Sequence, residues 1–278
     1  MDDVARSVAS HYSRHDDLPG RILAALPHTG GDPDHPTYEA VHHLDQFHLG
    51  GPPASRVLAD LGELHGEAVL DVGCGIGGPA RLLSQERGCT VTGVDLTQRY
   101  VTSARTISGW LGLGDATQFV CASALQLPVR DGAFSVAWSQ HAAMNIPDKD
   151  RLYAEIARVL RPGGRFLMHD IVAGPLRDPY YPVPWAHTPT ESFLLPANEV
   201  HARLRAAGLE EVVWQDASAE AIGRIRAARE RAAAGEPEKP GPDLIMGPEF
   251  ATMRENLSRS LEEARVSVVR SVWKKPGR

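Results

Sequence analysis

The sequence predicts an α/β fold: a doubly wound, mostly parallel seven-stranded sheet with helices on both faces. Two observations carry this expectation. Short apolar, β-branched segments alternate with amphipathic helical patterns through the middle of the 278-residue chain, which is typical of parallel sheets with right-handed crossovers. The first of these segments leads into a glycine-rich turn, Val69-Leu70-Asp71-Val72-Gly73-Cys74-Gly75-Ile76-Gly77-Gly78. Such a turn lets a ligand approach the backbone, because glycine has no Cβ and accepts positive φ angles.

Hydrophobic periodicity places the individual elements along the chain. Strands are expected over residues 68–72, 90–95, 117–121, 133–139, 164–170, 210–214 and 266–273. Helices are expected over residues 53–64, 78–86, 99–113, 148–160, 198–207, 218–234 and 248–264, with shorter ones at 2–12 and 21–26. Pro162-Gly163-Gly164 should end the helix that precedes the fifth strand.

The chain divides into an N-terminal cap segment, residues 1–54, and a main domain, residues 55–278. Within the main domain, residues 171–196 form a long connection rich in proline and aromatic residues. Connections of this length usually serve function, so this one is expected to be a lid or a pocket wall. Residues 217–278 supply the C-terminal helices and the last strand. The Ala/Arg/Glu-rich helix at 218–234 fits either a homodimer contact or a solvated face.

Composition and charge narrow the classes of function. With 42% hydrophobic residues, 23% charged residues and a formal net charge of −6, the sequence lacks the concentrated basic face that nucleic-acid binding requires. No segment approaches the roughly 20 apolar residues of a membrane span, and the acidic start Met1-Asp2-Asp3-Val4 is unlike a secretory signal. Three cysteines, Cys74, Cys89 and Cys121, have no CxxC spacing. We therefore expect a cytoplasmic protein with reduced thiols, whose partner is a small molecule rather than nucleic acid or membrane.

The glycine-rich turn by itself leaves the ligand open. Gly73-x-Gly75-x-x-Gly78 satisfies the GxGxxG pattern of dinucleotide-binding turns, which is a weak signal alone. Asp71 would repel a pyrophosphate at this turn and attract a ligand that presents an ammonium group. Asp95 ends the second strand, where a carboxylate can accept both hydroxyl groups of a ribose. These residues favour an adenosine ligand with a cationic end over a nicotinamide cofactor, which stays a distant alternative.

Four motifs in this order resemble those of the class I S-adenosylmethionine-dependent methyltransferases, which have a Rossmann-like fold. The resemblance covers about residues 60–215. It is carried by the matches to the family's glycine-rich turn, its second-strand acid, its GDAxxLPF…FDVV segment and its RVLKPGG turn, at residues 69–78, 94–95, 122–128 with 134–138, and 158–164. It implies an antiparallel last strand in the sheet and S-adenosyl-L-methionine as the cofactor.

The resemblance also implies roles for individual residues. The residues implied to bind the cofactor are Asp71, Gly73 and Gly75 at its amino-acid end, Asp95 on the ribose, Leu96, Ser123 and Ala124 at the adenine, and Gln140 along the methionine part. The family usually has Asp where Ser123 stands. The adenine amino group would therefore meet a shorter, neutral acceptor in this chain.

A narrower resemblance is to bacterial small-molecule methyltransferases, of the sarcosine/dimethylglycine type and of natural-product tailoring. It rests on residues 45–51, Asp-Gln-Phe-His-Leu-Gly-Gly, and on Trp138-Ser139-Gln140-His141. The sarcosine type has an acid where His141 stands, and that acid matches a cationic amine substrate. A histidine at this position argues against carrying the same substrate across.

His141 is the candidate general base. It follows the fourth strand at the carboxyl edge of the sheet, and a neutral imidazole can take up a proton near pH 7. The alternative is a histidine that only forms structural hydrogen bonds in the pocket wall. His169 and Asp170 end the fifth strand at the same edge, where one is expected to orient the other or to contact substrate, unless both only cap the strand. A base is needed only where the acceptor carries a proton of high pKa.

The cap and the long connection supply the remaining candidates. Gln46 and His48, with Gly50 and Gly51, are expected to close over the cofactor, and His48 also to face substrate. The run His42-His43-x-x-x-x-His48 matches no compact zinc motif, so no metal is expected. Tyr181 and Trp185, with Tyr180 and Phe193, are expected to wall an apolar substrate, unless they form a satellite core under the connection.

Together these observations predict a methyltransferase that acts on a small organic molecule of natural-product type, with a hydroxyl oxygen favoured over nitrogen or carbon. Two other classes stay open. One is a cyclase or rearrangement enzyme that binds the cofactor on the same fold without transferring its methyl group, because fold does not determine function. The other is a binding or scaffold protein with a degenerate site, against which the intact Asp71, glycine-rich turn and Asp95 speak.

Overall fold

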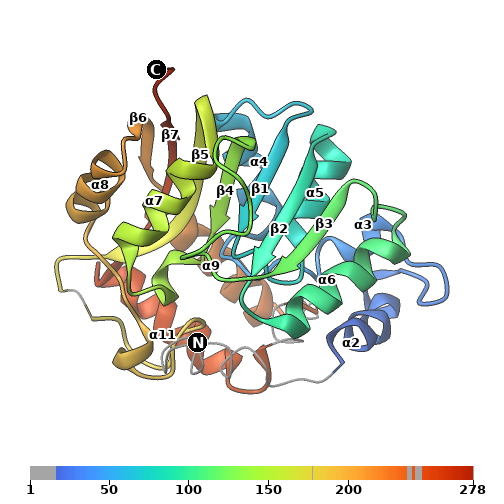
Figure 1. Cartoon of the computed structure of the whole chain (residues 1–278). Coiled ribbons are helices and arrows are strands. Elements are labelled where there is room, and N and C mark those ends of the chain that lie inside the picture. The colour runs from blue at the N-terminus through green and yellow to red at the C-terminus, as the bar shows by residue number, and fades with distance from the viewer. Residues whose placement is uncertain (1–16, 177, 237–239, 242–245, 278) are drawn as a thin grey trace.

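The computed structural model describes residues 17–176, 178–236, 240–241 and 246–277. Its centre is a seven-stranded sheet in the order β3-β2-β1-β4-β5-β7-β6 (Figure 1). The strands are β1 (Ala68–Val72), β2 (Thr90–Asp95), β3 (Thr117–Cys121), β4 (Phe134–Gln140), β5 (Leu160–Ala173), β6 (Glu210–Asp216) and β7 (Val266–Lys274). The predicted doubly wound sheet is confirmed. The helix predicted at 2–12 lies outside the described residues.

The sheet is parallel except at β7. Val69 of β1 pairs in parallel register with Val91 of β2 and with Val136 of β4. β7 runs antiparallel to both β5 and β6, which confirms the antiparallel last strand. The strand order reverses between β1 and β4, so the connections that leave these two strands diverge and open a crevice at their carboxyl ends. The glycine-rich turn follows β1 at this crevice.

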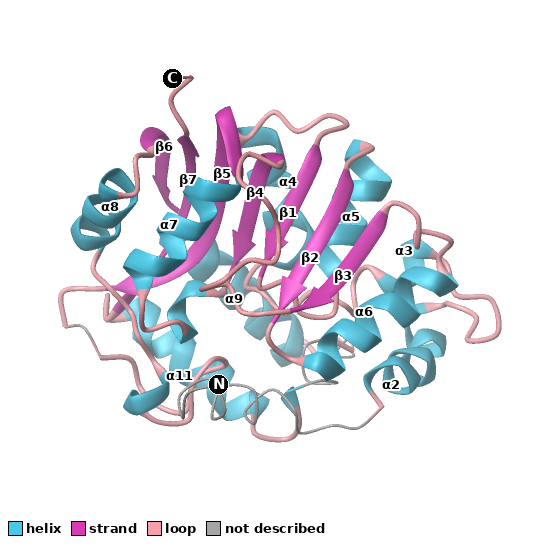
Figure 2. Ribbon diagram, viewed as in Figure 1, coloured by secondary structure: helices cyan, strands magenta, loops and turns pink. Residues whose placement is uncertain are grey.

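Helices cover both faces of the sheet. They are α2 (Leu18–Ala25), α3 (Tyr38–Val41), α4 (Gly51–Leu61), α5 (Gly78–Arg87), α6 (Gln98–Trp110), α7 (Lys149–Val159), α8 (Ala197–Ala206), α9 (Ser218–Ala233) and α11 (Phe250–Glu262), with 3-10 turns η1 (Leu26–Thr29), η2 (Ala143–Asn145) and η3 (Pro189–Glu191). Leu58, Leu82 and Ala104 bury α4, α5 and α6 against one face, and Leu152 and Val200 bury α7 and α8 against the other. Accordingly, α7 lies in front of the sheet and α4 behind it (Figure 2). No described helix is both long and apolar enough to cross a membrane.

β5 is longer than the sequence predicts. It begins at Leu160, directly after α7, where Leu160 pairs with Phe134 of β4. It runs to Ala173 because β7 pairs with it from Arg165↔Lys274 to Ala173↔Val266. The connection expected at 171–196 therefore starts after Ala173. α4 begins earlier than predicted, at Gly51, because proline suits the first turn of a helix, where the backbone N–H groups have no partner within the helix.

A buried ion pair fastens the cap segment to the helices of the sheet. Arg81 Nη2 of α5 donates to Asp45 Oδ2 at 2.9 Å, and neither side chain is more than 1% exposed. The same nitrogen donates to the backbone oxygen of Ile76, in the glycine-rich turn, at 2.7 Å. The pair therefore holds the cap against the carboxyl ends of the strands.

Candidate functional site

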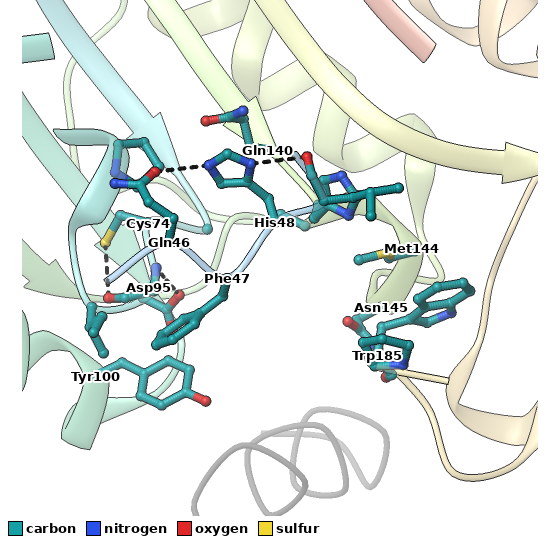
Figure 3. A pocket seen from close by; sticks show the side chains of 18 of the residues that line it. Gln46, Phe47, His48, Cys74, Asp95, Tyr100, Gln140, Met144, Asn145 and Trp185 are labelled. Atoms are coloured by element: carbon teal, nitrogen blue, oxygen red, sulfur yellow. Dashed lines mark hydrogen bonds between the residues drawn. The ribbon is translucent and has the colours of Figure 1, made fainter. Parts of the chain in front are cut away.

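A cavity of about 500 Å³ lies at the carboxyl ends of β1, β2 and β4. Its size is within the range of small-molecule sites. One side, the turn side, is formed by the glycine-rich turn, the end of β2 and residues 122–125. The other, the apolar side, includes Met144 and Trp185. His48 and Gln140 lie between the two sides (Figure 3). The cavity can thus hold two molecules, or one molecule with two chemically different parts.

The backbone of the turn side requires glycine. Gly73 and Gly75 line the cavity with φ angles of +80° and +54°, as the sequence led us to expect. A Cβ at Gly73 would lie 2.4 Å from the Ala142 side chain, and one at Gly78 would lie 2.2 Å from the backbone oxygen of Asp45. At Gly75 the nearest atom, on Phe47, is 3.7 Å away, so the backbone is open to a ligand there.

Asp95 presents its carboxylate to the turn side. Its Oδ2 accepts the N–H of Gly75 at 2.9 Å, and its Oδ1 accepts the N–H of Thr97 at 2.8 Å. Each carboxylate oxygen has a second lone pair, and although the Thr97 side chain also bonds this carboxylate, the carboxylate can still accept from a diol. Leu96, Ser123 and Ala124 line the same side, and the Ser123 hydroxyl accepts the N–H of Leu125 at 3.2 Å.

Asp71 lies behind the turn rather than in the lining of the cavity. It is 1% exposed, and its Oδ2 has no hydrogen-bond partner among the described residues. Burial, with the charge of Asp95, raises the pKa of Asp71 to about 8. An isolated buried carboxylate is costly, so a cation that reaches the turn from the cavity would stabilise its charged form.

A hydrogen-bond network joins the cap to the end of β4. His48 Nε2 lies 2.9 Å from Gln46 Oε1 and 3.0 Å from the Ser55 hydroxyl. That hydroxyl donates to Gln140 Oε1 at 3.0 Å, and Gln140 Nε2 lies 3.3 Å from His169 Nδ1. Gln46, His48 and Gln140 also line the cavity. Burial lowers the pKa of His48 to about 4, so its ring is neutral at pH 7.

Histidines near the cap do not assemble a metal centre. His42 stacks on Tyr38, with ring centroids 5.0 Å apart, while His48 belongs to the network above. In the part of the chain that the structure describes, no group of three or more His, Cys, Asp or Glu side chains is placed to hold a metal ion.

His141 has an unusual backbone conformation at the end of β4. Its φ is +52°, in the left-handed region that non-glycine residues rarely adopt. Its N–H donates to the backbone oxygen of His169 at 2.9 Å. The residue lines the cavity, and its Nε2 is buried without a hydrogen-bond partner. Burial, with the charge of nearby His48, lowers the pKa of His141 to about 3. A neutral imidazole with an unsatisfied nitrogen can bind a hydroxyl group in the cavity.

Of the predicted substrate contacts, His48 and Trp185 line the cavity, whereas His169 and Tyr181 do not. His169 lies within β5, and its ring packs against that of His141, with ring centroids 4.9 Å apart. Tyr181 packs into the apolar cluster under the connection. Trp185 is held in the wall because its backbone oxygen accepts Asn145 Nδ2 at 2.7 Å.

Sequence reasoning did not single out several lining residues. Tyr100 lies near Phe47 on the turn side, with ring centroids 6.2 Å apart. Ile225 of α9 and Leu257 of α11 reach the apolar side, and Phe250 of α11 also lines the cavity. An apolar residue on an amphipathic helix has the same pattern whether it faces a core or a cavity, so no signal in the sequence distinguishes them.

Comparison with known proteins identifies the segment that carries this turn. A family described as "Methyltransferase domain" matches residues 70–168, which include the glycine-rich turn, Asp95 and His141. Residues 70–168 carry a methyltransferase domain. Methyltransferase GfsG of Streptomyces halstedii is 33% identical over 62% of this chain and 60% of that protein. 24-methylenesterol C-methyltransferase 2 of Arabidopsis thaliana is 36% identical over 38% of this chain and 30% of that protein. The chain thus aligns with 60% or less of the length of these two relatives.

Solved structures extend the likeness beyond the methyltransferase domain. The [4+2]-cyclase SpnF is 26% identical, with a TM-score of 0.67 over 98% of this chain and 97% of that chain. Geranyl diphosphate C-methyltransferase from Streptomyces coelicolor A3(2), in complex with S-adenosyl-L-homocysteine, is 18% identical, with a TM-score of 0.72 over 99% of both chains. At that identity the second structure shows a shared fold alone.

The residues of the turn side fit S-adenosyl-L-methionine, the cofactor of this methyltransferase domain. The Asp95 carboxylate can accept from the ribose hydroxyls. The open backbone at Gly75 admits the amino-acid end, and the unpartnered Asp71 carboxylate lies behind the same turn as a counter-charge for its ammonium group.

The raised pKa of Asp71 predicts how stability depends on pH. Because folding raises this pKa from 3.8 to about 8, the stabilisation by protonated Asp71 is full below pH 3.8 and is lost as the pH rises to about 8. An Asp71→Asn variant stays neutral, so its free energy of unfolding should rise relative to the wild type by up to about 1.4 kcal/mol per pH unit between about pH 5 and 8. Urea unfolding of both cofactor-free proteins measures this difference. A difference that does not change with pH would contradict the raised pKa.

Proposed function

We propose that the chain transfers the methyl group of S-adenosyl-L-methionine to a hydroxyl oxygen of a small, largely apolar organic molecule. The observation that carries the proposal is the neutral imidazole of His141, a partly exposed residue of the cavity wall whose buried Nε2 has no partner among the described residues. Such a nitrogen is suited to accept the hydrogen bond of a hydroxyl group.

The charges around the cavity favour oxygen over a cationic amine. Asp45 and Asp95 are the carboxylates that the structure places in the wall. Asp45 is paired with Arg81 at 2.9 Å, and Asp95 belongs to the turn side. The lining described on the apolar side therefore offers no anion to hold an ammonium group on the acceptor.

In this mechanism the bound cofactor supplies a methyl group on a positively charged sulfur. Asp95 would hold the ribose, and the turn would carry the amino-acid end in front of Asp71. His141 accepts the hydrogen bond of the acceptor hydroxyl, orients its oxygen and takes its proton. Holding two reactants in line can lower the barrier by on the order of 7–11 kcal/mol.

The low pKa of His141 determines when the proton moves. With a pKa of about 3, His141 is a weak base. It would therefore take the proton only once the hydroxyl has become strongly acidic, as a hydroxyl does when its oxygen is alkylated. Met144, Ile171 and Trp185 line the cavity with apolar surface, which keeps water from competing for the methyl group.

A second candidate function is a cyclisation or rearrangement in which the cofactor is bound but not consumed. The observation that favours it is the likeness to the [4+2]-cyclase SpnF over nearly the whole chain. A large apolar side and a weakly basic His141 would also suit a pericyclic reaction, which needs shape and exclusion of water more than proton transfer.

Methyl-labelled S-adenosyl-L-methionine separates the two candidates. The purified chain is incubated with a panel of apolar alcohols and phenols and with the same compounds blocked as methyl ethers. Methyl transfer to oxygen predicts label in neutral product and stoichiometric S-adenosylhomocysteine from the free hydroxyl compounds, and none from the blocked ones. Conversion of a compound without S-adenosylhomocysteine formation would overturn methyl transfer and support the cyclase.

A further inference from the structure

The segment between β6 and β7 forms part of the cavity wall. Its helices α9 and α11 lie beyond the carboxyl ends of the central strands, beneath the sheet (Figure 1). Ile225 of α9 and Phe250 and Leu257 of α11 all line the cavity. For the helix at 218–234 the sequence indicated only a dimer contact or a solvated face, so the contact assigns this segment a place in the cavity wall.

The two helices are fixed to each other. Arg229 of α9 donates to Glu255 of α11 at 2.7 Å and to Glu262 at 3.2 Å. Leu257 also belongs to a buried apolar cluster with Ala221 of α9. The pair, α9 with α11, therefore behaves as one unit, which we call the C-terminal hairpin.

The hairpin is also fixed to the long connection and to β5. Asn256 Nδ2 donates to the backbone oxygen of Pro182 at 2.9 Å, and the N–H of Tyr180 donates to the Ser260 hydroxyl at 2.9 Å. Trp185 and Ile171 share the buried cluster of Leu257. The apolar side is thus a continuous wall built from three segments that are far apart in the sequence.

The C-terminal hairpin lies on the side of the cavity that faces the turn side. The turn side, with Asp95 and Tyr100, lies opposite Met144, Asn145 and Trp185 across the cavity (Figure 3). Ile225 and Leu257 pack in the same cluster as Met144 and Trp185, and so belong to the far side. A molecule that touches them is the acceptor.

We propose that the C-terminal hairpin is the acceptor-specificity element of this chain. Ile225, Phe250 and Leu257 bind an apolar body that extends from the methylated hydroxyl, and the reach of the first two side chains sets the length of the body that fits. The acceptor class is therefore an alcohol with an extended hydrocarbon part rather than a compact polar metabolite. This proposal rests on the proposed function for the location of the reacting hydroxyl beside His141.

Binding of linear primary alcohols, from butanol to dodecanol, tests the proposal. Titration calorimetry is done on the full chain saturated with S-adenosylhomocysteine. For the wild type the affinity should rise about fourfold per added methylene until the alcohol reaches the hairpin wall. Ile225→Trp fills the wall, so the rise should stop at a shorter alcohol. Phe250→Ala opens it, so the rise should continue to a longer one.

Ala251→Phe is the matched control, because Ala251 is an exposed neighbour on α11 outside the lining of the cavity. It should reproduce the wild-type series. The affinity for S-adenosylhomocysteine shows whether each variant is folded. If Ile225→Trp no longer binds S-adenosylhomocysteine, the test rests on Phe250→Ala alone. An unchanged series in Phe250→Ala, or the same shift in Ala251→Phe, overturns the proposal. Length-dependent binding without any methyl transfer would contradict the proposed function and leave this inference standing.

Discussion

Replacing His141 by asparagine should lower kcat by about 10²-fold, the lower end of the contribution of a general base because its low pKa makes His141 a weak one, and leave the affinity for S-adenosyl-L-methionine unchanged. Asparagine is among the residues that best tolerate a φ of +52°, so the backbone at the end of β4 should keep its course. The substitution removes the unpartnered Nε2 that would receive the proton. Single-turnover kinetics and cofactor titration measure the two quantities separately.

His169→Asn is the control for this variant. His169 lies behind His141 and outside the lining of the cavity, so its loss should change kcat less. The pH profile adds a second check. Because burial lowers the pKa of His141 to about 3, kcat should not fall as the pH decreases through 6.5, the ordinary value for histidine. An acid limb near that value in the wild type, or an undiminished kcat in His141→Asn, would contradict the assignment.

Replacing Asp45 by asparagine should lower the free energy of unfolding by about 3–5 kcal/mol, because it leaves the Arg81 guanidinium buried without its counter-ion. Arg81 is fully buried and is bonded to Asp45 through both Nε, at 3.1 Å, and Nη2, at 2.9 Å. Its remaining bonds go to neutral groups, including the Ile76 backbone oxygen. Urea unfolding of the variant and the wild type gives the difference.

An exposed pair provides the comparison. Arg87 and Asp60 are 2.6 Å apart, but Asp60 is 63% exposed, so Asp60→Asn should cost about 1 kcal/mol or less. Equal costs for the two variants would mean that water reaches the Asp45–Arg81 pair. The double variant Asp45→Leu/Arg81→Met should recover much of the loss, because it removes both buried charges together.

The sheet could be predicted strand by strand from local pattern. The bounds of β1, β2 and β3 agree with the predicted ranges, because their apolar, β-branched runs end at turn residues. β5 could not be predicted to its full length. Its last residues, such as Ile171, are strand only because Val268 of β7 pairs with them, and that pairing is remote in sequence.

The two sides of the site differ in the same way. Gly73, Gly75 and Asp95 act through local backbone geometry, which a short motif encodes, and the structure brings them together. Ile225 and Phe250 reach the cavity only through the packing of the C-terminal hairpin, so the local sequence pattern could not predict that they line the cavity. The positive φ of His141 is likewise invisible in the sequence.

In the hydrogen-bond network between the cap and β4, Arg81 determines which groups donate and which accept. Arginine can only donate, so Asp45 accepts, and Gln46 turns its amide nitrogen toward Asp45 at 2.9 Å and its oxygen toward His48. Trp138, also a pure donor, fixes the Gln140 oxygen in the same sense at 3.1 Å. The Gln140 amide nitrogen then donates to His169 Nδ1, which places the proton of that ring on Nε2.

Amide groups cannot pass protons on as histidine or water can. Gln46 and Gln140 therefore block proton transfer on either side of His48 and Ser55. In the proposed mechanism, a proton taken up at His141 would therefore find no route through these described residues into the cap, and it would return to the solution by way of the cavity.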